Sequence, residues 1–338
     1  MTFHTQKIIF YWMIILILLI LVMVSIGGAT RLTNSGLSIV EWKPITGIIP
    51  PFSEEDWDNE FGKYKQFQEF KTINYAMNIE GFKKIFWLEF IHRLAGRFVG
   101  LVFFIPAIFF WCLCKFDSGT KKTVSILLIL GLCQGIMGWY MVQSGLSNSP
   151  YVSHFRLAAH LFFALIMYLV LLFRSVQIFY KKNLVIKLKS IELITMCFAI
   201  LQIVLGALVA GLDGGLIYNE FPLMGNSFIP DELFKVRVLD YLYSPAIVQF
   251  FHRLCGYILS IFIIITVFKL IEKRNYYLAI IVFILLFIQI YLGIFTLVNH
   301  VPFIAAILHQ LFAFILVGVL LISLLFLQKS EVEELRII

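Results

Sequence analysis

The sequence has little charge for its length. Only 14% of its 338 residues are Asp, Glu, Lys or Arg, whereas 61% are hydrophobic and the mean hydropathy is +0.93. A soluble domain has roughly 25% charged residues, so this composition excludes an ordinary soluble protein. The net charge of +7 is not gathered on a soluble basic face of the kind that binds nucleic acid. We therefore expect no nucleic-acid partner.

Cysteine is also scarce, and its placement excludes a disulfide framework. The five cysteines lie inside apolar runs or at their ends: Cys112, Cys114, Cys133, Cys197 and Cys255. No small-residue cleavage site follows the first apolar run at signal-peptide distance, and no Arg-rich transit segment precedes it. We therefore expect that run to remain as a membrane span, in a bacterial cytoplasmic (inner) membrane.

Long apolar runs dominate the chain. Eight of them are long enough to cross a bilayer as helices, near residues 9–29, 85–113, 123–143, 155–179, 191–212, 245–270, 276–298 and 303–327. The sequence predicts an all-α, multi-pass integral membrane protein with eight transmembrane helices. Lysine and arginine collect after the second, fourth and sixth runs: Lys115, Lys121, Lys122, Lys181, Lys182, Lys187, Lys189, Lys269, Lys273 and Arg274. Because such residues favour cytoplasmic turns, both termini are predicted to be cytoplasmic.

One long connection, residues 30–84, is predicted to lie on the outer side. Within it, aromatic residues recur at three- and four-residue steps: Trp57, Phe61, Tyr64, Phe67 and Phe70. This spacing predicts an amphipathic helix that lies on the membrane face or caps the bundle. The pattern leaves open whether the helix only packs or also contacts a substrate.

The chain contains an internal repeat. The stretch from Glu89 to Gly96 recurs 160 positions later, from Gln249 to Gly256, with glutamine in place of the glutamate. A glutamine four residues before a glycine also recurs, as Gln134 and Gly138, Gln202 and Gly206, and Gln289 and Gly293. These matches predict two tandem four-helix bundles, residues 1–180 and 181–338. Each has an even number of spans, so a parallel pseudo-twofold axis along the membrane normal would relate them.

Four histidines occupy equivalent places in the repeat: His92, His160, His252 and His309. Each lies in the first third of an even-numbered span, so all four are predicted at similar depth toward the outer face. A single histidine inside a membrane can simply bond a neighbouring helix. Two facing imidazoles in each bundle can instead bind a planar macrocycle, because histidine is a common axial ligand of haem iron. Zinc is a poorer fit, since no cysteine or carboxylate completes a four-ligand set.

Charged residues adjoin these histidines. Arg93 and Arg253 directly follow them and Arg97 lies one turn deeper, where guanidinium groups can bind the haem propionates or extend toward the membrane interface. Arg156, one turn before His160, is a weaker candidate. Glu89 shares a helix face with His92 and is interpreted as an acid–base group, with a structural pair to Arg93 or Arg97 as the alternative.

These motifs resemble those of haem A synthase. The resemblance rests on Glu89-x-x-His92-Arg93-x-x-Gly96-Arg97, on Phe251-His252-Arg253 and on His160 and His309. It also rests on the segment from Gly28 to Ser38 with Trp42-Lys43-Pro44, which is similar to the proteobacterial and mitochondrial branch of the family. Another branch has a cysteine pair in the first outer loop, and here that loop has none. The resemblance covers essentially the whole chain.

The resemblance implies oxidation of the C8 methyl group of haem O to the formyl group of haem A, for cytochrome oxidase assembly. It implies that His92 and His160 flank the substrate haem, that His252 and His309 ligate a haem B cofactor for electron transfer, and that Glu89 is catalytic. Haem O synthase, an electron acceptor and membrane lipid are the implied partners. The sequence leaves the oligomeric state, the electron acceptor and the oxygen source open.

Two other functions compete with this interpretation. A dihaem b-type cytochrome between quinol and a partner would need two equivalent bis-histidine sites, and the exchange of Glu89 for Gln249 argues against it. A transporter built from parallel repeats would carry polar groups near mid-membrane and broken helices. Here the polar groups cluster toward the outer face, and no proline interrupts the middle of the third to seventh spans.

Overall fold

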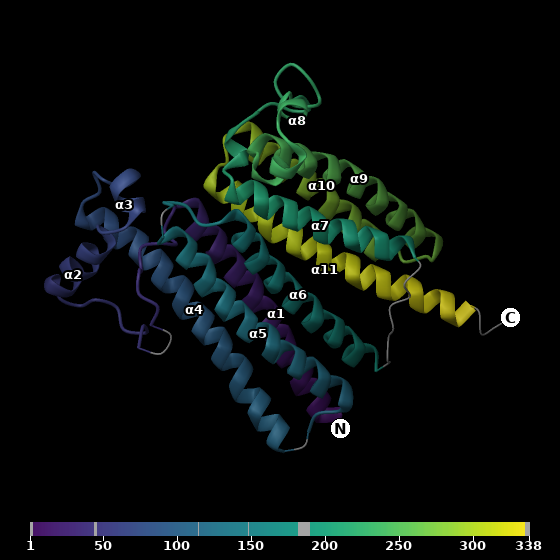
Figure 1. Cartoon of the computed structure of the whole chain (residues 1–338). Coiled ribbons are helices and arrows are strands. Elements are labelled where there is room, and N and C mark those ends of the chain that lie inside the picture. Colours follow the sequence, from purple (N-terminus) through teal and green to yellow (C-terminus); the bar gives the residue numbers. More distant parts are fainter. Residues whose placement is uncertain (1–2, 44–45, 114, 148, 182–189, 335–338) are drawn as a thin grey trace. The chain divides into compact units, whose positions relative to one another are not determined.

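The computed structural model describes residues 3–43, 46–113, 115–147, 149–181 and 190–334, without the side chains of Phe3 and 329–334. Its long helices are α1 (Phe3–Leu32), α4 (Ile79–Cys112), α5 (Ser118–Gly145), α6 (His154–Tyr180), α7 (Ile191–Gly211), α9 (Pro245–Glu272), α10 (Tyr276–Val298) and α11 (Phe303–Glu334) (Figure 1). In this part of the chain, eight helices are long and apolar enough to cross a membrane. The prediction of an all-α protein with eight spans is confirmed.

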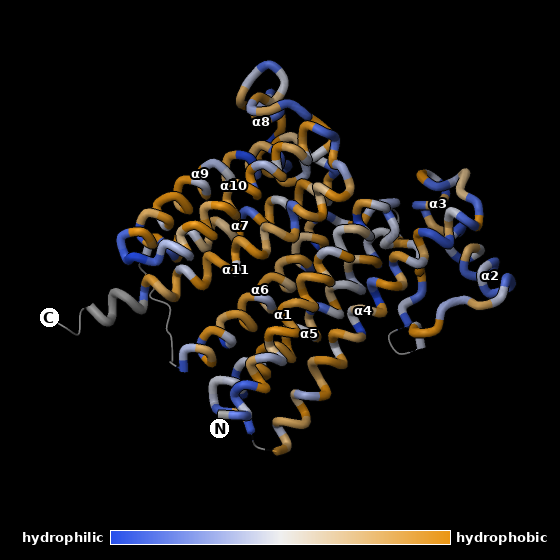
Figure 2. Tube along the Cα trace, turned by 180° about the vertical axis from the view of Figure 1, so that it is seen from behind, coloured by the Kyte–Doolittle hydropathy of each residue, from blue (hydrophilic) through white to orange (hydrophobic). Residues whose placement is uncertain are grey.

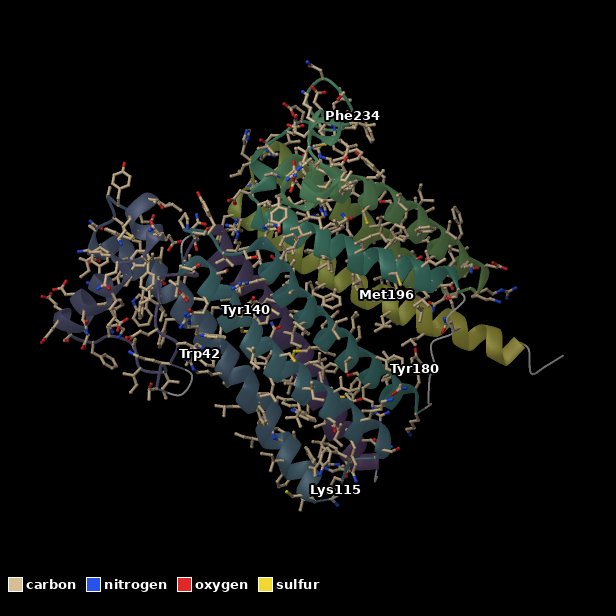
Figure 3. All side chains as sticks on the ribbon, viewed as in Figure 1. Trp42, Lys115, Tyr140, Tyr180, Met196 and Phe234 are labelled. Carbon is tan, nitrogen blue, oxygen red and sulfur yellow. The ribbon has the colours of Figure 1, made fainter. Side chains whose placement is uncertain are left out.

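Hydropathy follows these helices closely. Figure 2 shows the hydrophobic colour running along the long helices, with hydrophilic residues at their ends and around α2 (Glu54–Tyr64) and α3 (Gln68–Thr72). Figure 3 places Lys115 at the turn after α4 and Trp42 beside the middle of that helix, where Arg97 binds the neighbouring Lys43. Pro44, Cys114, Lys182, Lys187 and Lys189, which the sequence interpretation used, lie outside the described residues.

Polar residues at the helix starts explain where the chain enters its helices. The side chains of Asn78, Asp117, Ser190, Ser244 and Asn275 each accept a hydrogen bond from a backbone N–H in the first turn of α4, α5, α7, α9 and α10. Such caps satisfy donors that have no partner within the helix. The short loops therefore need few residues to end one span and begin the next.

The chain divides into two compact units. The first unit runs from Ile15 to Met167, and the second runs from Tyr168 onward together with the beginning of α1 up to Ile14. In the second unit, α7 packs against α9 and α11, and α10 packs against the same two helices, so the four form a closed bundle. In the first unit, α4 packs against α2 and α5. The pseudo-twofold relation between the units and their orientation in a membrane stay predictions.

Helix α4 is longer than a membrane requires. Its 34 residues extend over about 50 Å at about 1.5 Å per residue, whereas a span needs only about 20. The first turns carry Phe82 and Phe86, on which Trp57, Phe61 and Tyr64 of α2 pack in one apolar cluster. The structure thus places the aromatic stripe of the outer segment against α4. The expected single helix is interrupted between Tyr64 and Gln68, because Phe67 has an extended backbone.

A buried carboxyl group lies in α3. We call α2 and α3, together with the start of α4, the cap. Glu69 in α3 is only 4% exposed, and its Oε2 accepts a 3.0 Å hydrogen bond from the Tyr64 hydroxyl. That hydroxyl accepts a 2.7 Å bond from Asn74 Nδ2. Burial raises the pKa of Glu69 to about 7, and the charge of Glu89 adds to the rise, although the bond from Tyr64 opposes it. Glu69 therefore takes up a proton near neutral pH, unlike an exposed glutamate.

The stability of the cap should consequently depend on pH. Between the ordinary pKa of 4.5 and about 7, the folded state keeps the Glu69 proton that the unfolded chain releases, so stability falls as pH rises through this window. We expect hydrogen exchange of α2 and α3 amides, corrected for intrinsic rates, to speed up over the same range. Glu69→Gln should abolish the trend, and Glu80→Gln, at a surface carboxylate, should preserve it. A wild-type cap with pH-independent protection would contradict the assignment.

Candidate haem-ligand sites

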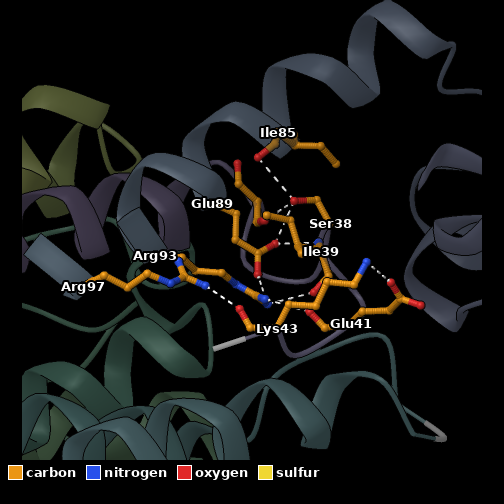
Figure 4. Close-up of polar contacts among 9 residues, drawn as sticks. Ser38, Ile39, Glu41, Lys43, Ile85, Glu89, Arg93 and Arg97 are labelled. Carbon is orange, nitrogen blue, oxygen red and sulfur yellow. Dashed lines mark hydrogen bonds and ion pairs between the residues drawn. The ribbon is translucent and has the colours of Figure 1, made fainter. Parts of the chain in front are cut away.

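Glu89 is buried against the outer segment that follows α1. The residue is 3% exposed. Its Oε2 accepts hydrogen bonds from Ser38 Oγ at 2.7 Å and from the Ile39 amide at 2.8 Å (Figure 4). Its Oε1 accepts a 2.6 Å bond from Arg93 Nη2. The ion pair that sequence reasoning kept as the structural alternative for Glu89 is therefore present, and its catalytic role stays a prediction.

The neighbouring arginines bind the backbone of the same segment. Arg93 donates to the carbonyl oxygens of Ile39 at 2.7 Å and Glu41 at 3.1 Å, and Arg97 donates to that of Lys43 at 2.7 Å (Figure 4). A cavity of about 270 Å³ lies beside them, lined in part by Arg93, Arg97, Lys43, Phe86 and Phe90. The arginines thus fix the outer segment to α4 and still border an open space. Their predicted role toward propionates is not tested by these contacts.

The second unit repeats this arrangement with other atoms. Arg253 donates to the carbonyl oxygens of Tyr218 at 2.6 Å and Glu220 at 3.0 Å, which lie 179 positions after those that Arg93 binds (218 minus 39 and 220 minus 41). It also donates to Leu223 O and, at 2.9 Å, to Gln249 Oε1. The helices that end before these segments are followed by Asn34 and Asp213, both with a left-handed backbone.

Glu89 and Gln249 differ in the direction of their hydrogen bonds. Gln249 Nε2 donates to the carbonyl oxygens of Gly214 and Ile217, both at 2.7 Å, whereas Glu89 accepts from Ser38 and Ile39. The outer segment presents donors to Glu89 in the first unit and carbonyl acceptors to Gln249 in the second. Ser38 stands where the second unit has Ile217, so a hydroxyl donor is present only beside the carboxylate. In this pair of positions, only the first unit has an ionisable carboxyl group.

Matched substitutions can test the two arginines, Arg93 and Arg253, that anchor the outer segments. Arg93→Ala would leave the buried Glu89 charge without its cationic partner, which costs about 3–5 kcal/mol. Arg253→Ala would remove hydrogen bonds to neutral groups only, which costs about 1–3 kcal/mol. We expect a larger loss of unfolding free energy in mixed micelles, and faster proteolysis after α1, for Arg93→Ala. Equal losses would contradict a stabilising charge pair at Glu89.

The four histidines each pack against a glycine of a neighbouring helix in the same unit. A Cβ built on the glycine would lie 3.4 Å from His92 at Gly27, 3.2 Å from His160 at Gly138, 3.1 Å from His252 at Gly206 and 2.9 Å from His309 at Gly293. Any larger side chain at these positions would press on the ring. Because glycine has no side chain, each imidazole ring can lie close to the backbone of the neighbouring helix.

Two histidines lie near one another in each unit. The charges of His92 and His160 would interact in the first unit, and those of His252 and His309 in the second. Their pairing around a haem stays a prediction. Buried polar atoms without a hydrogen-bond partner gather here: within the described residues these include Nδ1 of His160, His252 and His309 and Oε1 of Gln134, Gln202 and Gln289. Buried polar atoms are nearly always satisfied, so such a gathering fits a site that receives a ligand.

The donor set suits a haem. Each unit offers two imidazoles, and in the described part of the chain no third His, Cys, Asp or Glu joins either pair. Iron in a porphyrin already has four ring nitrogens and needs only two axial ligands, for which histidine is common. The residues therefore fit one haem per unit, with His92 and His160 in the first and His252 and His309 in the second.

Some functional contacts were missed by sequence reasoning. Ser38 was only part of a motif, and its bond to Glu89 joins residues 51 positions apart. The sequence shows the glutamine–glycine motif only as a repeat. The structure shows that its glycines contact the histidine rings and that Gln134 and Gln202 also do so. Arg156, a weaker propionate candidate, lies over the Tyr140 ring at 3.5 Å and donates to its carbonyl oxygen.

Comparisons with known proteins agree with these features. Residues 10–321 match the family model COX15-CtaA, described as cytochrome oxidase assembly protein. A relative from Rickettsia bellii (strain OSU 85-389), named Heme A synthase, is 46% identical over 332 residues, covering 94% of this chain and 97% of the relative. Those from Rickettsia africae (strain ESF-5) and Rickettsia prowazekii (strain Madrid E), with the same name, are each 45% identical, covering 95% and 94% of this chain and 98% and 97% of theirs. The chain belongs to the COX15-CtaA family of cytochrome oxidase assembly proteins.

Proposed function

We propose that this protein is a haem A synthase that oxidises the C8 methyl group of haem O to a formyl group by successive hydroxylations and loss of water. The proposal is supported by relatives of that name at 45–46% identity over nearly the whole chain. It is also supported by two histidine pairs whose surroundings differ at one proton-active residue. That difference, Glu89 against Gln249, is the observation that carries the proposal.

The two units have different tasks in this proposal. His92 and His160 hold the substrate haem in the first unit, and His252 and His309 hold haem B in the second, for electron transfer. The methyl group is unactivated, so the oxidising power comes from haem iron when it is bound. The chain itself binds the rings, orients the methyl group and handles protons.

Glu89 is the proton-handling residue of the first site. It lies one helical turn before His92, on the same face of α4, and its carboxylate is shielded from bulk water by the outer segment. Ser38 and Arg93 fix its two oxygens, so the carboxylate is held in one orientation. A buried, oriented carboxylate can accept a proton from a hydroxylated intermediate. Gln249 cannot do so.

The arginines would complete haem binding. Arg93, Arg97 and Arg253 are charged groups beside the histidines, and Arg93 and Arg97 border the cavity next to α4. Propionate carboxylates are favourable partners for guanidinium groups. Because the same arginines hold the outer segments, binding of a propionate would be coupled to the position of those segments.

The cellular setting follows from the same proposal. The protein would lie in a bacterial inner membrane with both termini in the cytoplasm and its haem sites toward the outer face. Haem O carries an apolar tail, so it would enter between helices from the lipid. Haem O synthase and an electron acceptor would be its partners.

Substitution of Glu89 tests the proposal. Glu89→Gln should retain both haems but lose nearly all formation of haem A, measured by extracting the haems from cells that also produce haem O. Ser38→Ala, which removes one bond but keeps the carboxylate, should retain substantial activity and so separates proton chemistry from support of the loop. His252→Ala should lose the resident haem B.

Two outcomes would contradict these assignments. A normal yield of haem A from Glu89→Gln would show that Glu89 does not have the catalytic role. A wild-type protein that binds two haems yet forms no haem A would instead favour a dihaem cytochrome.

A further inference from the structure

Met23 occupies in the first unit the place that Gln202 occupies in the second. Met23 lies four residues before Gly27 and Gln202 four residues before Gly206. The two positions are 179 apart (202 minus 23), the same offset that relates the carbonyl groups bound by Arg93 and Arg253. The glutamine–glycine motif thus has a fourth copy, in α1, in which the glutamine is methionine.

Contacts in the structure support this equivalence. Met23 Cε lies 3.7 Å from the position of a Cβ on Gly96, one turn after His92, and Gln202 Nε2 lies 3.3 Å from that of Gly256, one turn after His252. Both side chains therefore project from an odd-numbered span onto the helix that bears the histidine. They meet it at the same level of the repeat.

The glutamines restrain histidine rings through their amides. Gln202 Nε2 lies 3.4 Å from His252 Nε2, and Gln134 Nε2 lies 3.3 Å from His160 Nε2. Each of these two rings thus contacts an amide and, one turn further along the same helix, a glycine. Rotation of the ring would break a buried polar contact, which is unfavourable.

His92 has a different environment. A thioether has no N–H to donate, and methionine is flexible. The ring of His92 therefore lacks the amide contact that Gln202 gives to His252.

We propose that Met23 acts through His92: because Met23 offers no amide, the His92 ring can move. We also propose that His92 is the ligand of the first site that leaves the haem iron when substrate and product exchange. The inference rests on the proposed function and deepens it. A substrate haem must enter and a product must leave in every cycle, whereas a resident cofactor stays. The second unit restrains His252 with the amide of Gln202, whereas the first unit has Met23 at that position and leaves His92 without an amide, which matches this division.

Exchange of the two side chains tests the proposal. Carbon monoxide binds ferrous haem only when an axial position opens, so its binding rate reports how easily a histidine leaves the iron. In the reduced full-length protein, we expect Met23→Gln to slow carbon monoxide binding at the first site several-fold. Gln202→Met should make binding measurable at the haem B site. The formyl group of the product shifts its absorption away from that of haem B, which separates the two signals.

Controls separate restraint from general damage. Met23→Leu keeps an apolar side chain and should leave the rate unchanged. Gln289→Met should have a smaller effect than Gln202→Met, because the Gln289 amide donates to the His309 backbone carbonyl rather than to the ring. The ferric electron paramagnetic resonance signal, which depends on imidazole orientation, should shift in Met23→Gln and Gln202→Met only.

The outcomes distinguish this proposal from the proposed function. Unchanged carbon monoxide rates in both Met23→Gln and Gln202→Met, with both haems bound, would overturn the role of Met23 while haem A formation persists. Faster binding at the haem B site than at the first site in the wild-type protein would also overturn it. A purified protein that contains no haem would show that the proposed function itself had failed.

Discussion

A half-buried arginine that binds backbone carbonyl groups holds each outer segment to the helix bearing the first histidine of its unit. Arg93 does this for α4 and Arg253 for α9, and the carbonyl groups that they bind correspond along the chain. A guanidinium group has five donors in a fixed plane, so one side chain can satisfy several carbonyl oxygens that no helix or sheet satisfies. Everything nearer the histidines depends on this contact, because it sets where the outer segments lie.

The residue four positions before each arginine gives the two anchors different chemistry. In the second unit, Gln249 donates to carbonyl groups and accepts from Arg253, so this pair carries only the charge of the arginine. In the first, Glu89 accepts from Ser38 and Ile39 and pairs with Arg93. The reversal requires a hydroxyl at position 38 and a different approach of the backbone. The first unit thus has an ionisable carboxyl group, Glu89, where the otherwise similar second unit has the amide of Gln249.

The histidines show a second, less obvious asymmetry between the units. All four lie on glycines, which permits close packing, and Nδ1 of His160, His252 and His309 has no hydrogen-bond partner. Gln134 and Gln202 supply an amide to the ring nitrogens of His160 and His252, whereas the first unit has Met23 at the position that corresponds to Gln202, where it contacts α4 at Gly96. Membrane interiors offer few water molecules to satisfy such groups, so a single amide changes how firmly a ring is held. Together with Glu89, Met23 distinguishes the first unit from the second.

The sequence by itself determined the eight apolar helices and the repeat, because helix length and periodicity in a membrane depend on local composition. From that repeat it predicted the histidine pairs and the special place of Glu89, whose roles stay predictions. It also predicted an aromatic stripe at Trp57 to Phe70, but not that the helix breaks at Phe67 or that it packs on Phe82 and Phe86. Only the tertiary structure decided which donors surround Glu89 and which glycine faces each histidine. These contacts join residues far apart in the chain, such as Ser38 with Glu89 and Gln202 with His252, and no local pattern specifies the distance between them.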